Sequence, residues 1–287
     1  MRISHALIAF LLWSAAAARA ADVEPLIIRP VTLPRGAVDL TLHGTYTNWG
    51  TGGTLEGGTL AAGVDFGATD SIQFGLAAAF PISPGAGFGS LLGSAALAAN
   101  KNSAFRLDAG YESIGFSSGP GRTNRFFGGL GARFRFPITP TVAFVTGRIG
   151  AVQFGHFNNL GTGGVGLYFG ASGLSEAAAD FLVVSGGDNG SSTNFGINLP
   201  AGLLLQADPH LAVTLQAGYS TVIETNSGTV SLHYIPLALE AVLSPVSALD
   251  VGFRFFLDGL FAETGGTGGV PGYFDTRALF FWLRLRA

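Results

Sequence analysis

The sequence predicts an all-β fold, a closed antiparallel β-barrel of about 12 strands that crosses a lipid bilayer. Apolar residues alternate with small or polar ones, charged residues make up only 11% of the chain, and turn-like connections alternate with longer Gly-rich ones. Globular proteins usually carry about 25% charged residues. This chain therefore lacks the polar side chains needed to cover a water-facing surface, and we expect lipid to be its outer solvent.

The first residues have the composition of an export signal. Arg2 supplies a positive start, residues 6–13 are apolar, and Ala18 and Ala20 are the small residues that a signal peptidase requires. We expect residues 1–20 to be a signal peptide, cleaved before Ala21. Residues 21–36 contain three prolines and little alternation, which predicts an irregular periplasmic lead with access to the barrel lumen from below.

The strands are predicted from a period of two. In residues 59–67, for example, Leu60, Ala62, Val64 and Phe66 fall on one face of a strand. The same pattern predicts strands at 37–47, 57–67, 71–80, 89–99, 103–115, 125–136, 141–153, 193–206, 210–222, 230–243, 248–260 and 275–286. These segments match the roughly 9 to 11 residues of a membrane-crossing strand better than the roughly 5 to 6 of a soluble one. A transmembrane helix over the uncharged residues 71–100 is disfavoured by Pro81 and Pro84.

The connections between these strands alternate in length. Short turns are predicted at 68–70, 100–102, 137–140, 207–209 and 244–247, with longer loops between them. With 12 strands both termini lie on the short-turn side. Residues 154–192 are the longest connection and leave two alternatives open: two further strands, which would make 14, or a short helix folded over or into the barrel mouth. We favour 12.

Taken together, these features resemble the Gram-negative outer-membrane β-barrel superfamily over residues 21–287. They are the signal peptide, the absence of Cys, the amphipathic strands, the alternating connections and a last strand that runs to the end of the chain. The resemblance implies an outer-membrane location, with membrane lipid, small solutes and the barrel assembly machinery as partners. The last strand places Phe281, Leu283 and Leu285 on one face, but the chain ends in Ala287 where the superfamily usually has an aromatic residue.

Several other classes of protein are disfavoured. A net charge of −3 with a single Lys gives no basic patch for nucleic acid. Gly-rich matches at 161–166 and 115–119 carry little weight in a chain with 44 Gly. The histidines that follow the signal, at positions 43, 156, 210 and 233, have no Ser two residues later and no local nucleophile. We therefore expect no enzyme activity, no cofactor and no metal site.

Charged residues on the strands are predicted to face the lumen. In residues 103–115, Phe105 and Leu107 fall on one face while Arg106 and Asp108 fall on the other. An Arg facing lipid at mid-bilayer costs about 2 to 4 kcal/mol. The predicted lumen charge cluster is Asp39, Arg106, Asp108, Arg133, Arg135, Arg148, Arg254, Arg284 and Arg286. These residues either pair with one another in a filled lumen or form a constriction that favours anions.

Some apolar residues are also predicted to face inward. They are Phe127, Phe144, Leu204, Phe256, Leu260, Phe280 and Trp282, and they form either packing in a narrow barrel or a path for hydrophobic compounds. A 12-strand barrel lies between the roughly 8 strands that close on side chains and the 16 to 18 that leave an aqueous channel. The sequence thus predicts a passive channel or transporter for small solutes. The alternatives are a transporter of hydrophobic compounds and a non-conducting structural or adhesion barrel with a plugged lumen.

Overall fold

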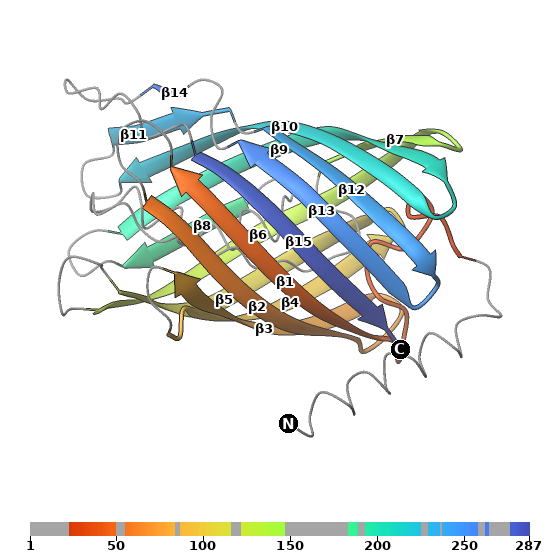
Figure 1. Ribbon diagram of the computed structural model, residues 1–287, viewed down its shortest axis with the longest axis horizontal. Helices are drawn as coiled ribbons and strands as arrows, with labels where there is room; N and C mark the ends of the chain where they lie inside the picture. The colour runs from red at the N-terminus through yellow and green to blue at the C-terminus, as the bar shows by residue number, and fades with distance from the viewer. Residues whose placement is uncertain are drawn as a thin grey trace.

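A single sheet makes up the fold in the computed structural model (Figure 1). The structure describes residues 23–49, 55–83, 87–115, 122–146, 183–188, 193–224, 229–235, 237–257, 262–263 and 276–287, and within these ranges it contains strands but no helix. No helix in the described part of the chain is long and apolar enough to cross a bilayer. The strands are β1 (Val38–Trp49), β2 (Leu55–Gly67), β3 (Ile72–Ser83), β4 (Ser90–Asn100), β5 (Ser103–Gly115), β6 (Arg122–Thr139), β7 (Val142–Val145), β8 (Val183–Asp188), β9 (Thr193–Asp208), β10 (Leu211–Glu224), β11 (Thr229–Tyr234), β12 (Leu237–Val246), β13 (Leu249–Leu257), β14 (Ala262–Glu263) and β15 (Thr276–Arg286).

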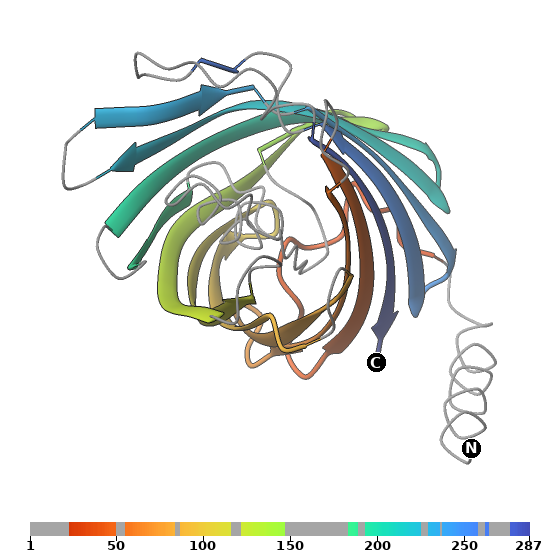
Figure 2. The ribbon, with the colours of Figure 1, turned by 60° about the vertical axis from the view of Figure 1, so that its left-hand side comes forward.

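The sheet closes on itself between the first and last strands. β1 to β6 pair in sequence order, and β15 pairs antiparallel with both β13 and β1. The seam between β1 and β15 runs without interruption from Asp39 opposite Arg286 to Trp49 opposite Thr276. Backbone bonds between Val38 and Ala287, 2.9 and 2.8 Å long, extend the seam to the end of the chain. The closed wall is seen in Figure 2.

At three places in the wall, two strands that follow one another in the chain together occupy the place of a single strand. β7 and β8 both pair with β6 and β9, at different levels. β11 and β12 both pair with β10, while β13 and β14 pair with β12 and β11 respectively. The described strands therefore make a 12-strand wall. The predicted fold class, a closed antiparallel transmembrane β-barrel of 12 strands, is confirmed, and the count of 14 is not needed.

Some strand boundaries differ from the prediction. The predicted strand 230–243 is divided into β11 and β12 at residues 235 and 236, where Pro236 lacks the N–H that a ladder requires. β8 falls in the segment predicted as the longest loop, where residues 181–184 are apolar. Beyond β7, most of the predicted strand 141–153 lies outside the described residues, as do residues 1–20 and most of the long loops.

The outer face of the wall is apolar. Large apolar side chains on 12 of the strands are exposed, including Leu42 at 53%, Leu76 at 53% and Leu107 at 54%. Their neighbours in sequence are buried and often polar: His43, Ala77 and Asp108 are 5%, 4% and 3% exposed. The predicted alternation is confirmed on β2, β3 and β5. An exposed apolar band of this extent is a lipid-facing surface rather than a water-facing one.

Phe144 is an exception, because the prediction placed it inside. It is 36% exposed and its ring lies 6.2 Å from that of the outward-facing Phe136, while Ala143 and Val145 are fully buried. Phe144 has the same parity as Arg148, which was predicted to face the lumen. Arg148 lies outside the described residues, beyond the end of β7, so its parity does not fix that of Phe144.

The short turns gather at one end of the barrel, together with the C-terminus and residues 23–37 (Figure 1). Polar side chains close several of them: Thr69 Oγ1 accepts from Ile72 N at 3.0 Å, and Asp208 Oδ1 accepts from His210 N at 2.7 Å. Such side-chain acceptors replace the ladder bonds that a turn loses. We call this end the short-turn end.

Gly252 shows how closely the inner side chains pack. It lies opposite Trp282 across β13 and β15, and a Cβ atom at position 252 would overlap the indole ring. We expect Gly252→Ala to displace Trp282, break its 3.0 Å bond from Nε1 to Glu240 Oε1, and lower the free energy of unfolding by about 1 to 3 kcal/mol. Urea unfolding in detergent measures this effect. Gly93→Ala is the control, because the nearest atom to a Cβ there is 3.8 Å away, and equal losses in both variants would contradict the packing argument.

Candidate functional site

Residues 23–37, which comprise the described part of the predicted lead and Ala37, lie inside the short-turn end of the barrel (Figure 2). We call these residues the lead. The lead contains no strand, because Pro25, Pro30 and Pro34 lack the N–H groups that a ladder needs. Several of its other N–H groups bond the wall instead: Ile27 N donates to Gln206 Oε1 at 3.0 Å, and Leu33 N donates to Gln73 Oε1 at 2.9 Å. Further bonds run from Val31 N to Lys101 O (3.1 Å) and from Gly36 N to Gly67 O (2.7 Å). The lead is thus attached at several points around the circumference.

One side of the lead is packed against an apolar part of the wall. Leu26 and Ile27, 3% and 2% exposed, form one buried cluster with side chains from β7, β9, β10, β12 and β15. The wall residues of this cluster are Ala143, Val145, Leu204, Ala212, Val242 and Trp282. Leu204 and Trp282 were predicted to face inward as packing or as a hydrophobic path. In the structure they face inward and pack in the same buried cluster as the lead.

The strongest attachment of the lead is ionic. Arg29, 3% exposed, donates from Nη1 to both carboxylate oxygens of Asp250 at 2.8 and 2.9 Å, and from Nη2 to Ser244 Oγ at 3.1 Å. Asp250 also accepts from Nε of Arg284 at 2.9 Å and pairs with its Nη2, as well as accepting from Ser244 Oγ. A buried carboxylate between two guanidinium groups satisfies the requirement that buried charges be paired. Arg29 therefore joins the lead directly to β12 and β13, and through Asp250 to β15.

The closing seam belongs to the same network. Asp39 on β1 accepts from Arg286 Nε at 3.1 Å and lies 3.8 Å from Arg284 Nε, both on β15. Asp39, Arg284 and Arg286, three members of the predicted lumen charge cluster, meet across the seam. A continuous chain of ion pairs thus runs from the lead through Asp250 and Arg284 to Asp39.

Arg106, Asp108 and Arg135 make their contacts outside this chain of ion pairs. Arg106 and Asp108 pair with each other on β5 at 2.8 Å. Arg135, 1% exposed, donates to the carbonyls of Leu26 and Lys101 at 3.2 Å and to Asn102 Oδ1 at 2.6 Å, so it ties β6 to the lead and to a short turn.

Arg254 lies farther from the short-turn end, among aromatic rings. Its guanidinium carbon is 5.2 Å from the centre of the Phe256 ring and 5.9 Å from that of Phe280, which stacks on His43 at 5.3 Å. This arrangement is typical of cation–π contacts. Of the remaining predicted residues, Arg148, Leu260 and the side chain of Phe127 lie outside the described part of the chain.

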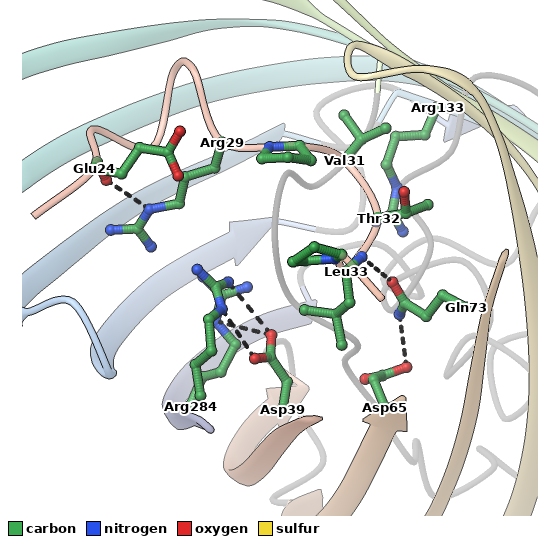
Figure 3. A pocket seen from close by; sticks show the side chains of 13 residues that line it. Glu24, Arg29, Val31, Thr32, Leu33, Asp39, Asp65, Gln73, Arg133 and Arg284 are labelled. Atoms are coloured by element: carbon green, nitrogen blue, oxygen red, sulfur yellow. Dashed lines mark hydrogen bonds and ion pairs between the residues drawn. The ribbon is translucent and has the colours of Figure 1, made fainter. Parts of the chain in front are cut away.

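A cavity of about 250 Å³ lies on the other side of the lead (Figure 3). It is bounded by Arg29 to Pro34 of the lead and by side chains from β1, β2, β3, β6 and β15, including Asp39, Asp65, Gln73, Arg133 and Arg286. Gln73 Nε2 donates to Asp65 Oδ1 at 2.9 Å and so orients this wall. The lead therefore divides the short-turn end into a packed apolar half and a hollow polar half, and the hollow half is the candidate site.

Sequence reasoning missed several residues of this site. Arg29, Asp65, Gln73, Ser244 and Asp250 were not in the predicted cluster. Asp65 and Asp250 were detectable, because each lies on the face of its strand opposite the exposed apolar residues Val64 and Phe253. Arg29 had no such signal, because the lead has no periodicity. Among the described residues no group of three or more His, Asp or Glu side chains is placed to hold a metal ion.

Gly67 provides a test of the docked position of the lead. A Cβ atom at this position would overlap the carbonyl of Pro34, which is backbone and cannot move aside like the end of a side chain. We expect Gly67→Val to push the lead off the wall and increase its cleavage by an added protease. Gly44→Ala is the control, since the nearest atom to a Cβ there is 3.8 Å away. If the lead stays as resistant in Gly67→Val as in the parent protein, its docked position is wrong.

Comparison with known proteins finds similarity to solved structures but not to known sequences. No protein-family model matches the chain, and no curated protein sequence matches it either. Among solved structures, the NanC porin aligns over 86% of this chain and 98% of its own, with 6% identity and a TM-score of 0.47. The KdgM porin aligns over 86% and 98%, with 8% identity and a TM-score of 0.43. LpxR from Salmonella typhimurium aligns over 85% and 99%, with 10% identity and a TM-score of 0.45. The fold itself rests on the strand pairing described above.

Proposed function

We propose that this protein is a passive channel for small solutes in a bacterial outer membrane, narrowed at its short-turn end by the lead. The observation that carries the proposal is the hollow polar half of that end, where charged and amide side chains from five strands surround a cavity beside the lead. An apolar outer face and a polar inner face are what a closed barrel needs to carry water-soluble compounds across a bilayer. Solutes would pass along β15, β1, β2 and β3, because the opposite half is filled by Leu26 and Ile27.

A second candidate function is a non-conducting structural barrel. It is favoured by the extent of the lead's attachment, which includes Arg29 buried against Asp250 and Leu26 buried in the apolar cluster. A transporter of hydrophobic compounds has less support, because Leu204 and Trp282 are 1% exposed and packed in the cluster of the lead.

Planar-bilayer recording separates the two candidates. For the channel we expect small, steady conductance steps from the purified mature protein, and passage of small sugars but not of larger oligosaccharides in liposome swelling. If the mature protein folds normally but gives no conductance steps and no liposome swelling, the structural barrel is supported and the channel is rejected.

A further inference from the structure

We propose that the hollow half of the short-turn end is a binding site for a small oxyanion, of the kind presented by phosphate, sulfate and carboxylate groups. The inference deepens the proposed channel function by naming a class of solute. It stands on the side chains that line the cavity, the partners of the acidic ones, and the size of the space.

The lining is rich in guanidinium groups. Arg29, Arg133, Arg284 and Arg286 line the cavity, against the three carboxylates of Glu24, Asp39 and Asp65. Each guanidinium carries five N–H donors in a planar fork that fits two oxygens of one oxyanion. Arg286 directs Nε and Nη2 at Asp39, over 3.1 and 3.4 Å, and its side chain is 27% exposed. It is therefore the arginine of the cavity best placed to meet an incoming solute.

Two of the three carboxylates of the cavity are engaged. Asp39 accepts from Arg286 and lies beside Arg284, and Asp65 accepts from Gln73. These contacts occupy acceptor positions on Asp39 and Asp65, so the negative charge that these two carboxylates present to the cavity is reduced. A solute that brings oxygen acceptors complements this lining, and a cation would have to displace an arginine to reach Asp39.

The volume of the cavity fits a small ion. Pockets for drug-sized ligands have volumes of about 300 to 1,000 Å³. The cavity, at about 250 Å³, is large enough for an oxyanion of a few heavy atoms with several waters. Its position beside the lead puts such an ion in the half of this end that Leu26 and Ile27 do not fill.

The test is calorimetric titration of the folded mature protein in detergent with inorganic phosphate, sulfate, acetate or chloride at low ionic strength. We expect saturable binding of the oxyanions and at least tenfold weaker binding in Arg286→Gln. Arg35→Gln is the matched control, because Arg35 is an exposed lead residue that contacts Asp70 through its backbone N. Phosphate and sulfate binding without acetate binding would assign the site to tetrahedral anions, and the reverse to carboxylates.

Two results would overturn the inference. One is the absence of saturable binding to the parent protein, and the other is equal binding by Arg286→Gln and Arg35→Gln. The titration needs no membrane current, so its outcome is separate from that of the channel. Binding by a protein that is silent in bilayers would reject the channel and keep the site, whereas steady conductance without binding would reject the site alone.

Discussion

Removal of residues 23–35 is expected to raise the single-channel conductance several-fold. The lead fills half of the short-turn end through Leu26 and Ile27 and borders the cavity in the other half. Without it, the bore at that end is set by the barrel wall, and 12 strands enclose more space than the roughly 8 that close on their own side chains. Planar-bilayer recording of the deletion variant beside the parent protein measures the change.

The deletion also removes Arg29, one of the two arginines that pair with Asp250, and uncovers apolar wall residues, so its folding must be followed independently. Heat-modifiable electrophoretic mobility reports whether the barrel forms. Ile28→Ala is a matched control within the lead, because Ile28 is 47% exposed and we expect its removal to leave the conductance unchanged. A folded deletion variant with the conductance of the parent protein would show that the lead does not narrow the bore.

Loss of the Asp250 charge is expected to be the most destabilising single change. In Asp250→Asn, Arg29 and Arg284 remain buried, 3% and 2% exposed, without the carboxylate that pairs both. Removing one partner from a buried ion pair costs about 3 to 5 kcal/mol, because an uncompensated charge is left behind. We expect a loss of this size in the free energy of unfolding, measured by urea titration in detergent micelles.

Asp70→Asn is the comparison for this variant. Asp70 is exposed and accepts from Arg35 N at 3.1 Å in a short turn, so we expect its neutralisation to cost under about 1 kcal/mol. Arg29→Gln should fall between the two, because Arg284 still pairs with Asp250. Similar losses for Asp250→Asn and Asp70→Asn would mean that the buried network contributes little to stability.

The wall could be predicted from the sequence because its signal is local. On β3, Phe74, Leu76 and Phe80 are 52%, 53% and 44% exposed, while Ala77 and Ala79 are 4% and 0% exposed, as the period of two requires. The breaks in the wall were harder to place. β8 lies between the same two strands as β7, although 37 residues separate β7 from β8 in the chain. No local pattern indicates that two distant segments share one place in a sheet.

The site could be predicted only in part. Parity predicted that Asp39, Arg284 and Arg286 face the lumen, and the pairing of the first strand with the last brings them together at one seam. The position of Arg29 could not be predicted from the sequence, because Arg29 and Asp250 are 221 residues apart and the lead has no periodic pattern that fixes its direction. Prolines predicted that the lead would not pair as a strand, but not which wall groups would accept its N–H bonds.

Spin labelling along β3 tests the central claim, that alternate residues meet lipid and a polar bore. The chain has no Cys, so single cysteines introduced at positions 74 to 80 can be labelled without background. In liposomes we expect collisions with lipid-dissolved oxygen to be frequent at 74, 76, 78 and 80 and rare at 75, 77 and 79. Uniform oxygen access, or a maximum at the odd positions, would contradict the transmembrane barrel.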